Sequence, residues 1–181
     1  MIDAVAGGVT DRPAVACARL TADQYGEVAS WLAEPQVNRW LYAEWRERPV
    51  DERLIALAAR GARNAMWLCT VDQAPYGLVA VGGIAPTDRS GVLWYVRNPF
   101  ATRRPGAMSA CVAAAVRTAF DALGLHSLQA SVQSDNQASE ALLRTVGFQF
   151  VGVRREAFHV DSRFIDARLF DLLPGEIREP A

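Results

Sequence analysis

The sequence predicts a single α/β (α+β) domain built from about seven strands and about four helices. Seven stretches have the composition of strands, and turn-prone segments separate several of them. An Ala-rich run with apolar residues at helical spacing interrupts the series. The chain has 181 residues, 51% of them hydrophobic, which fits one core. We expect the domain over residues 13–175, between a flexible lead, residues 1–12, and a tail, residues 176–181.

The first elements are expected to be a strand and a helix. Residues 15–20 alternate as a strand, and Thr21 is a suitable cap for a helix that Pro35 ends. A second helix is predicted for residues 50–60. The connection between the helices is crowded with aromatic side chains, namely Trp40, Tyr42 and Trp45.

Three strands joined by turns follow. Pro75 separates the first two, and the turn-prone residues 87–91 separate the second from the third. This pattern predicts an antiparallel meander. The strands are expected at residues 65–71, 77–84 and 92–97.

The second half begins with the longest predicted helix, residues 107–123, which is rich in Ala and ends at Gly124. A strand over residues 127–132 follows. The next helix runs to about residue 146, with Asp135 or Asn136 as its cap. The last two strands, expected to form a hairpin, lie at residues 148–156 and 164–172.

Charge and cysteine content exclude several classes of function. The net charge is -1 and the charges are scattered, so we expect no nucleic-acid partner. All 19 basic residues are Arg, which excludes covalent lysine chemistry. The three cysteines lie far apart among apolar or small neighbours, and we expect buried, reduced thiols and no metal site. They are Cys17, Cys69 and Cys111.

No stretch of the chain is apolar for long enough to form a signal sequence or to cross a bilayer. The first residues also lack a basic start. We therefore expect a cytoplasmic protein without a membrane partner.

The segment before residue 107 has the composition of an anion-binding turn. It contains Arg103, Arg104 and Gly106. Where a strand leads into a helix through a Gly-containing turn, free N–H groups and the helix dipole converge on one point. The two arginines would add charge-assisted hydrogen bonds. This pattern favours a phosphate or pyrophosphate ligand, with a merely solvated arginine loop as the alternative.

A second group of motifs lies near the end of the chain. Asn136 and Ser139 form an Asn-x-x-Ser pattern, and Gly147-Phe148 follows the helix that they begin. In this order and spacing, together with the arginine loop, these residues resemble the GNAT superfamily. The similarity is to the branch of ribosomal-protein N-terminal acetyltransferases and related sugar-amine acetyltransferases. Residues 34–40, Glu-Pro-Gln-Val-Asn-Arg-Trp, are similar to the same branch.

The resemblance implies a central mixed, mostly antiparallel twisted sheet, with a splay between strands 4 and 5. Acetyl-CoA would be the co-substrate, and its pantetheine arm would lie in the splay between Val96 and Val132, against a free strand edge. No metal is implied. The residues expected to bind the coenzyme are Val96, Arg97, Arg103, Arg104, Gly106, Ala107, Met108, Ser109, Asn136 and Ser139.

The resemblance also implies candidate catalytic residues. Many family members carry a tyrosine acid on the last helix, where this chain has Leu143. Ser139 is then the candidate donor of a proton to the departing thiolate, with a plain helix-surface serine as the alternative. Glu156 and His159, near the final hairpin, are further candidates, with surface residues as the alternative.

Aromatic side chains are expected to form the acceptor wall, because aromatic faces suit amines and sugars. Alternation along a strand would point neighbouring residues to opposite faces, and core packing is the alternative for each. The residues are Trp40, Tyr42, Trp45, Trp94 and Tyr95.

We therefore expect an N-acetyltransferase that acts by direct transfer in a ternary complex. Its acceptor would be a small amine, such as an amino sugar, or a peptide N-terminus. The alternative is a non-catalytic acyl-CoA-binding sensor or protein-interaction module on the same fold. The sequence does not decide the oligomeric state, and a homodimer is compatible with it.

Overall fold

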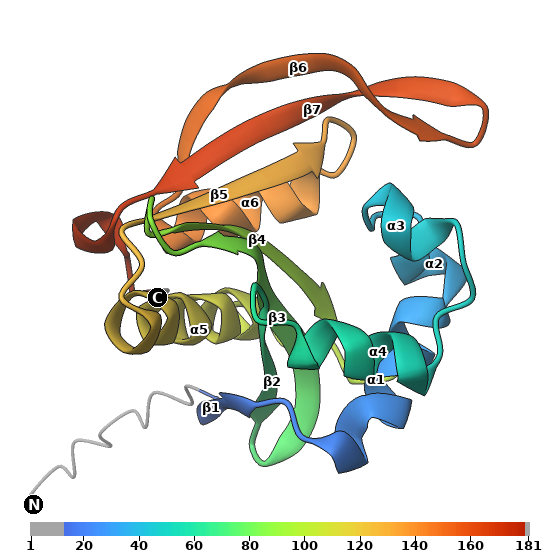
Figure 1. The fold of residues 1–181 in the computed structure, drawn as a ribbon, viewed down its shortest axis with the longest axis vertical. Coiled ribbons are helices and arrows are strands. Elements are labelled where there is room, and N and C mark those ends of the chain that lie inside the picture. Colours follow the sequence, from blue (N-terminus) through green and yellow to red (C-terminus); the bar gives the residue numbers. More distant parts are fainter. Residues whose placement is uncertain (1–12, 180–181) are drawn as a thin grey trace, which may run out of the picture.

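One seven-stranded sheet runs through the computed structural model, which describes residues 13–179, in the order β1-β2-β3-β4-β5-β7-β6 (Figure 1). All neighbouring strands are antiparallel except β4 and β5, which are parallel. The expected mixed, mostly antiparallel sheet is confirmed, while the predicted lead, residues 1–12, lies outside the described residues. The strands are β1 (Val15–Arg19), β2 (Ala65–Val71), β3 (Ala74–Ala85), β4 (Ser90–Arg97), β5 (Ser127–Gln133), β6 (Gln149–Val160) and β7 (Arg163–Leu172).

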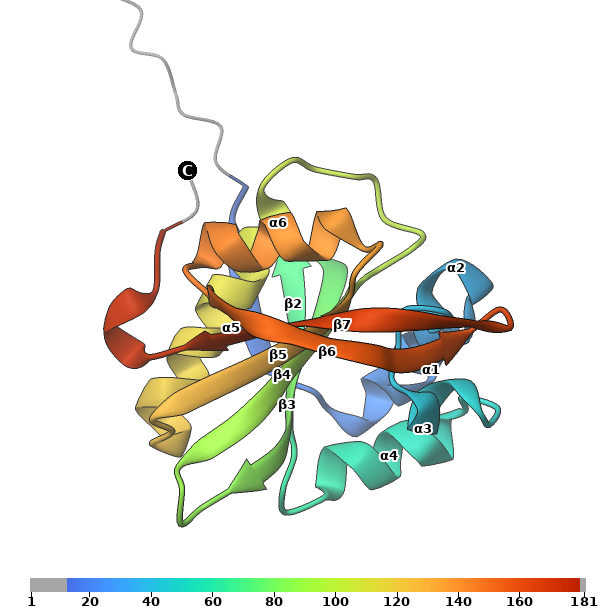
Figure 2. The same cartoon turned by 90° about the horizontal axis from the view of Figure 1, so that it is seen from above.

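Helices cover both faces of the sheet (Figures 1 and 2). In β2, Trp67 and Cys69 belong to the core under α5 and α6, whereas Met66 and Leu68 belong to the core under α1 and α4. This division follows from the alternation of side chains along a strand. The helices are α1 (Tyr25–Ala33), α2 (Pro35–Asn38), α3 (Ala43–Arg46), α4 (Glu52–Arg60), α5 (Ala107–Leu123) and α6 (Gln137–Val146), with 3-10 turns η1 (Ala22–Gln24) and η2 (Pro174–Glu176).

Two short helices, α2 and α3, lie in the aromatic connection and were not predicted. Pro35 follows the end of α1, as expected, but it also stands at the start of α2, where its missing N–H costs no helical hydrogen bond. Each helix has four residues, too few to give a helical period in the sequence. They bring Tyr42 and Trp45 to the core that contains Val96.

The helices beside the centre of the sheet begin and end where the sequence indicates. α5 starts after Gly106, whose φ is 75°, and ends at Gly124, whose φ is 62°. α6 starts after Asn136, whose side-chain oxygen accepts a hydrogen bond from Ser139 N at 3.1 Å. It ends at Gly147, whose φ is 114°. Glycine suits such positive φ values because it lacks a Cβ.

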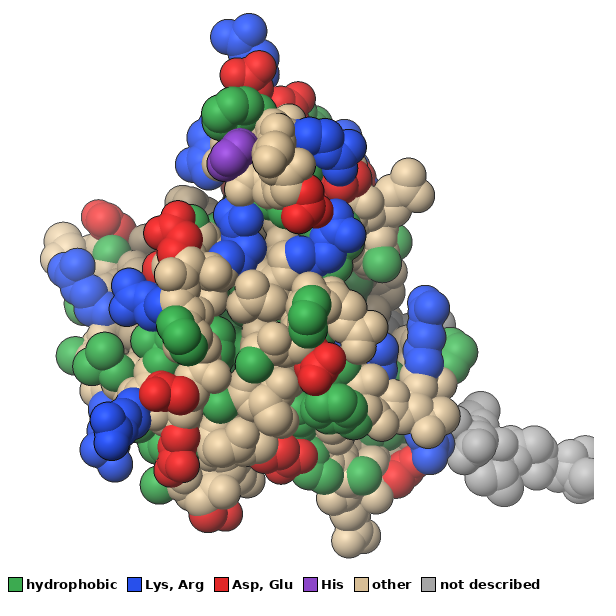
Figure 3. All heavy atoms as spheres, turned by 90° about the vertical axis from the view of Figure 1, so that its right-hand side faces the viewer, with side chains coloured by type: hydrophobic (Ala, Val, Ile, Leu, Met, Phe, Trp, Pro, Cys, Tyr) green, Lys and Arg blue, Asp and Glu red, His purple; other side chains and the backbone are tan. Residues whose placement is uncertain are grey.

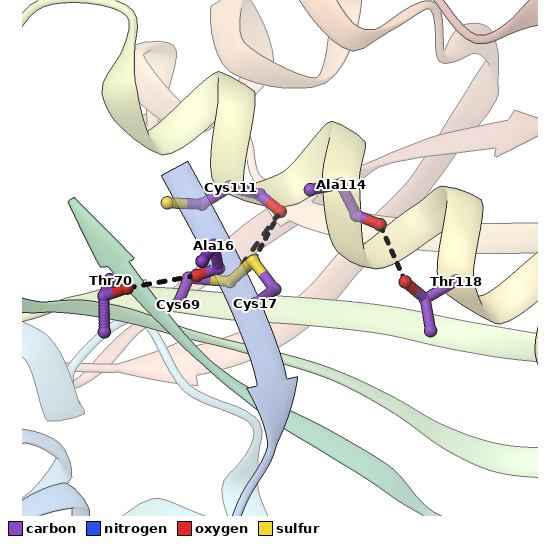
Figure 4. The surroundings of a disulfide bond; sticks show 7 residues. All are labelled: Ala16, Cys17, Cys69, Thr70, Cys111, Ala114 and Thr118. Atoms are coloured by element: carbon purple, nitrogen blue, oxygen red, sulfur yellow. Dashed lines mark hydrogen bonds between the residues drawn. A yellow bond between two sulfur atoms is a disulfide. The ribbon is translucent and has the colours of Figure 1, made fainter. Parts of the chain in front are cut away.

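The expectation of three reduced thiols is wrong. Cys17 and Cys69 are cross-strand partners on β1 and β2, with Cα atoms 4.1 Å apart, and they form a disulfide (Figure 4). Cys111 is a free thiol, buried in α5. The two bonded cysteines are separated by 52 residues in sequence, and only the register of β1 against β2 brings them together.

The β6–β7 hairpin extends past the rest of the sheet and reaches over α2 and α3 (Figures 1 and 2). Its pairing is interrupted between Arg154 and Phe158, where Glu156 adopts a φ of 51°. Farther along, Arg46 Nη1 donates a hydrogen bond to His159 O at 3.0 Å. The hairpin is thereby fastened to the N-terminal helices.

The chain continues past β7 as a packed segment. Ile177 lies against the core under α5 and α6, and Arg178 N donates a hydrogen bond to Val146 O at 2.8 Å. The described part of the predicted tail, residues 176–179, therefore contacts the domain.

Candidate active site

The gap between β4 and β5 is the main irregularity of the sheet. The strands pair at only three positions, all near their first residues, and then separate. Within residues 13–179, the β5-facing edge of β4 has no strand partner from Leu93 to Arg97. An unpaired edge offers N–H and C=O groups to an extended polar ligand. The paired positions are Ser90–Ser127, Gly91–Leu128 and Val92–Gln129.

The loop between β4 and α5 is held by polar groups beneath it. Asn98 is buried, and its Nδ2 donates a hydrogen bond to Pro75 O at 3.0 Å. The Tyr76 hydroxyl accepts a hydrogen bond from Arg104 N at 3.0 Å and donates one to Arg104 O at 3.2 Å. These contacts fix the path of the loop.

The three arginines expected to bind the coenzyme lie in different surroundings. Arg97 Nη1 donates to two carbonyls of the loop, those of residues 98 and 101, at 2.9 Å each. Arg104 Nη1 lies 3.1 Å from Asp72 Oδ2. Arg103 is exposed and has no side-chain hydrogen bond or ion pair within residues 13–179. Among these three arginines, and within the described residues 13–179, Arg103 is therefore the one whose side chain has no partner.

The first turn of α5 lies beside this loop. The N–H groups of Met108 and Ser109 have no partner within the helix, because the first turn of any α-helix lacks one. Ala107 N instead donates a hydrogen bond to Arg104 O at 3.3 Å, and its side chain is fully buried. The 17-residue helix also directs the positive end of its dipole here. This arrangement suits a phosphate group.

Gly77 of β3 allows Met108 to pack closely against the sheet. A Cβ at residue 77 would lie 2.8 Å from Met108 Sδ and 3.1 Å from Val96 O. A methyl group at residue 77 would therefore require Met108 and the backbone of Val96 to shift.

Ser139 stands in the first turn of α6 and contacts β4. Its Oγ lies 2.6 Å from the Tyr95 hydroxyl, which also donates a hydrogen bond to Ser139 O at 3.1 Å. Burial raises the pKa of Tyr95, so the phenol keeps its proton. Leu143, one turn farther along, is fully buried and has no hydroxyl. Ser139 therefore brings a hydroxyl from the first turn of α6 beside β4.

A cavity of about 640 Å³ runs from the arginine loop past Ser139 to the aromatic connection. Every residue predicted to bind the coenzyme lines it except Ala107. The structure thus brings together residues of β4, of the loop before α5, and of the start of α6. We refer to this cavity as the coenzyme-side cavity.

A second cavity, of about 860 Å³, lies between α3–α4 and strands β5–β7. We refer to it as the acceptor-side cavity. Trp45 and Trp94 pack together in its wall, with ring centroids 5.2 Å apart. Figure 3 views the side on which α3 and the β6–β7 hairpin meet, where acidic and basic side chains are interspersed. The charged residues that line this cavity are Glu44, Arg48, Arg154 and Asp171.

The two cavities meet at the gap between β4 and β5. Ser131 is one of the shared residues, and its Oγ is buried there. Two molecules that enter from different sides would reach each other here. The residues that line both cavities are Tyr42, Trp45, Trp94, Ala130 and Ser131.

The five aromatic residues expected in the acceptor wall divide between the cavities. Tyr42, Trp45 and Trp94 line both, whereas Trp40 and Tyr95 line only the coenzyme-side cavity. As alternation predicts, Trp94 and Tyr95 face opposite sides of β4, toward Trp45 and toward α6.

The hairpin candidates lie elsewhere. Glu156 and His159 are exposed and line neither cavity, and the His159 ring lies 4.8 Å from that of Phe164. The sequence gives no signal for Arg154, which lines the acceptor-side cavity, because its position depends on the path of the hairpin.

A parallel β4–β5 junction that opens into a gap, next to a helix start suited to an anion, is the arrangement expected of a coenzyme-A-dependent acyltransferase. Residues 18–149 match the acetyltransferase (GNAT) domain family, and the chain belongs to that family. It is an acetyl-CoA-dependent N-acetyltransferase. No match was found among curated proteins.

Solved structures with the same fold include three acetyltransferases. RimJ of Mycobacterium smegmatis, in complex with a CoA disulfide, is 21% identical over 92% of this chain and 85% of its own, with a TM-score of 0.75. The spermidine N-acetyltransferase of Vibrio cholerae, in complex with CoA and spermine, is 18% identical over 90% and 96%, with a TM-score of 0.78. RimL, a ribosomal L7/L12 alpha-N-protein acetyltransferase in complex with coenzyme A, is 15% identical over 88% and 93%, with a TM-score of 0.74.

Two further features concern residues 13–179 only. No three His, Cys, Asp or Glu side chains there are grouped as metal ligands. No helix in that range is long and apolar enough to cross a membrane. The cytoplasmic location stays a prediction.

Proposed function

We propose that this protein transfers an acetyl group from acetyl-CoA to a primary amine, of a small molecule or of a peptide N-terminus, by direct attack in a ternary complex. The meeting of the two cavities at the β4–β5 gap carries the proposal. A thioester in the coenzyme-side cavity and an amine in the acceptor-side cavity would approach each other at that point. Direct transfer then needs no covalent enzyme intermediate.

The coenzyme would be held by three kinds of group. The free N–H groups of Met108 and Ser109, with the unpaired Arg103, suit the pyrophosphate. The free edge of β4 suits the amides of the pantetheine arm. Asn136 lines the opposite wall and also caps α6.

The chemistry requires few protein groups. The lone pair of a neutral amine attacks the thioester carbonyl carbon, the new N–C bond forms, and the C–S bond breaks with its electrons on sulfur. Ser139 Oγ–H would protonate the thiolate, and the Tyr95 hydroxyl, 2.6 Å from Ser139 Oγ, would hold Ser139 in position. The nitrogen releases its extra proton to water, and water returns a proton to Ser139. An α-amino group with a pKa of about 7.7 to 8.0 needs no strong base.

A thiol-release assay tests the proposal. Acetyl-CoA is incubated with amino sugars, polyamines, aminoglycosides, amino acids and short peptides, beside a calorimetric titration of the coenzyme alone. We expect coenzyme binding and turnover with at least one amine. Absence of coenzyme binding would contradict the assignment of the arginine loop.

The second candidate is a non-catalytic acyl-CoA sensor. Leu143 favours it, because the buried leucine stands where many relatives carry a tyrosine acid. The same assay separates the two candidates. Coenzyme binding without thiol release from any amine would favour the sensor.

A further inference from the structure

The acceptor-side cavity carries charges that the protein itself leaves unpaired. Glu44 and Arg48 lie on the α3 side, and Arg154 and Asp171 lie on β6 and β7. Within residues 13–179, none of the four forms an ion pair. Other charged residues do pair, for example on α6, where Arg144 Nη2 lies 3.0 Å from Glu140 Oε1. The cavity therefore presents both signs of charge to a ligand.

Two of these charges lie near the junction of the cavities. Tyr42 lines both cavities, and burial raises the pKa of its phenol. The charge of Glu44 raises that pKa further, whereas Ser131 and the charge of Arg154 lower it. Glu44 follows Tyr42 by two residues in the chain, and Arg154 lines the same cavity from β6.

The balance of charge restricts the acceptor. A polyamine could pair with Glu44 and Asp171, but it would also bring positive charges toward Arg48 and Arg154, and like charges oppose binding. A simple amine would leave both guanidinium groups without an anionic partner. A molecule with an amine and a carboxylate satisfies both signs, and guanidinium groups bind carboxylates through paired hydrogen bonds.

The remaining wall is apolar. Trp45, Trp94, Leu54 and Leu57 contribute large apolar surfaces, and the volume of about 860 Å³ suits a small molecule. An acceptor with an apolar body would bury apolar surface against this wall.

We infer that the acceptor is a small amino carboxylate with an apolar body, its amine beside Glu44 at the junction and its carboxylate on Arg154. This inference rests on the proposed function. The inference excludes three classes as preferred acceptors. They are polyamines, amines that carry no carboxylate, and peptides without a carboxylate near the amine.

The test compares amines that differ only in the carboxylate. L-Phenylalanine, phenylalaninamide and phenethylamine share a ring and a primary amine, and leucine with leucinamide and isoamylamine forms a second set. Because their amines differ in pKa, kcat/KM is calculated for the neutral amine. We expect the amino acids to exceed both analogues by about tenfold or more, as a lost charge-assisted contact implies. Equal or better turnover of the analogues would overturn the inference.

A charge-reversal substitution tests whether Arg154 is the residue that binds the carboxylate. Arg154→Glu should abolish the preference for the carboxylate, while Arg155→Glu should keep it. Arg155 is the matched control because it is the next residue of β6, is exposed and lines neither cavity. Coenzyme titration and thermal melting establish that both variants are folded. Equal effects of the two reversals would overturn the role of Arg154.

The outcomes also separate this inference from the proposed function. Turnover confined to polyamines, peptides or amines without a carboxylate would support the proposed transferase function and overturn the inference that the acceptor is an amino carboxylate. No turnover with any amine, despite coenzyme binding, would overturn both.

Discussion

Ser139 and Tyr95 form the contact on which the proposed proton transfer depends. Ser139→Ala should lower kcat by about a hundredfold, because it removes the proton donor, and should leave coenzyme affinity nearly unchanged. Tyr95→Phe should have a smaller effect in the same direction, since it removes the partner at 2.6 Å but keeps the serine. Steady-state kinetics with the best amine, beside calorimetry of the coenzyme, measures both.

Ser134→Ala is the control for this pair. Ser134 is exposed and lines neither cavity. If Ser139→Ala retains the kcat of Ser134→Ala, Ser139 is not the acid.

Two glycines that end helices should differ in their tolerance of a side chain. Gly124 and Gly147 both have positive φ, but a Cβ at residue 124 meets open space, whereas at residue 147 it would collide with the backbone of Glu176. Gly124→Ala should cost about 1 kcal/mol of unfolding free energy, and Gly147→Ala about 1–3 kcal/mol more. Urea unfolding measures both, and equal losses would show that the segment after β7 does not pack on α6.

The Cys111 thiol should be inert in the folded protein. Burial raises the pKa of this thiol to about 12 from 9.0. In the unfolded chain it ionises from about pH 9, so the folded state loses stability as pH rises through that value. Between pH 9 and pH 10, below the ordinary tyrosine pKa, Cys111→Ala should have a flatter stability profile in urea titrations. An identical slope in the variant would contradict the burial.

The sequence indicates candidate site residues where they lie close together in the chain as a motif. The loop at residues 103–109 and the pair Asn136 and Ser139 are continuous in the chain, so their spacing indicates a ligand. The Tyr95–Ser139 contact joins residues 44 positions apart, and no periodicity reveals such a pair. The same holds for the Cys17–Cys69 disulfide.

At the scale of elements, the two neighbouring arginines of the loop before α5 are expected to contribute differently to coenzyme binding. Arg103→Ala should weaken coenzyme binding by about tenfold or more, because it removes an unpaired cation beside the helix start. Arg104→Ala should act less on affinity, since its guanidinium is already paired with Asp72 at 3.1 Å. Calorimetric titration of coenzyme A at two salt concentrations measures both. A larger loss for Arg104 would reverse the assignment.

Long elements were predictable and short ones were not. α5 was predicted over its full length, because its Ala-rich period is long and glycines bound it. α2 and α3 form four-residue turns whose stability comes from packing Tyr42 and Trp45, not from local propensity. The end of β6 was also missed, since the irregular pairing around Glu156 breaks the alternation.

For the whole molecule, the fold was predictable to the level of strand count and family, while the acceptor-side cavity was not. Its wall combines residues 42–58, 129–131 and 151–171, which meet only after the hairpin has folded over α3. The placement of β7 between β5 and β6 likewise follows from packing and not from pattern.

Hydrogen exchange should reveal the incomplete β4–β5 pairing. Amides of residues 93–97 that face the gap should exchange faster than those of β3, which has partners on both sides. Coenzyme A should slow them, and at a hundred times its Kd it should add about 2.7 kcal/mol of stability. Mass spectrometry with and without coenzyme measures this, and unchanged exchange at residues 93–97 would place the ligand elsewhere.

The three-position ladder between β4 and β5 also has a consequence for the lifetime of the protein in a cell. If the co-substrate binds along the unpaired edge of β4 as proposed, it would complete the sheet, and the supply of acetyl-CoA would set how often the molecule opens. Proteases act on opened molecules. The abundance of this enzyme would therefore follow the supply of the coenzyme that it consumes, without any change in the synthesis of the protein.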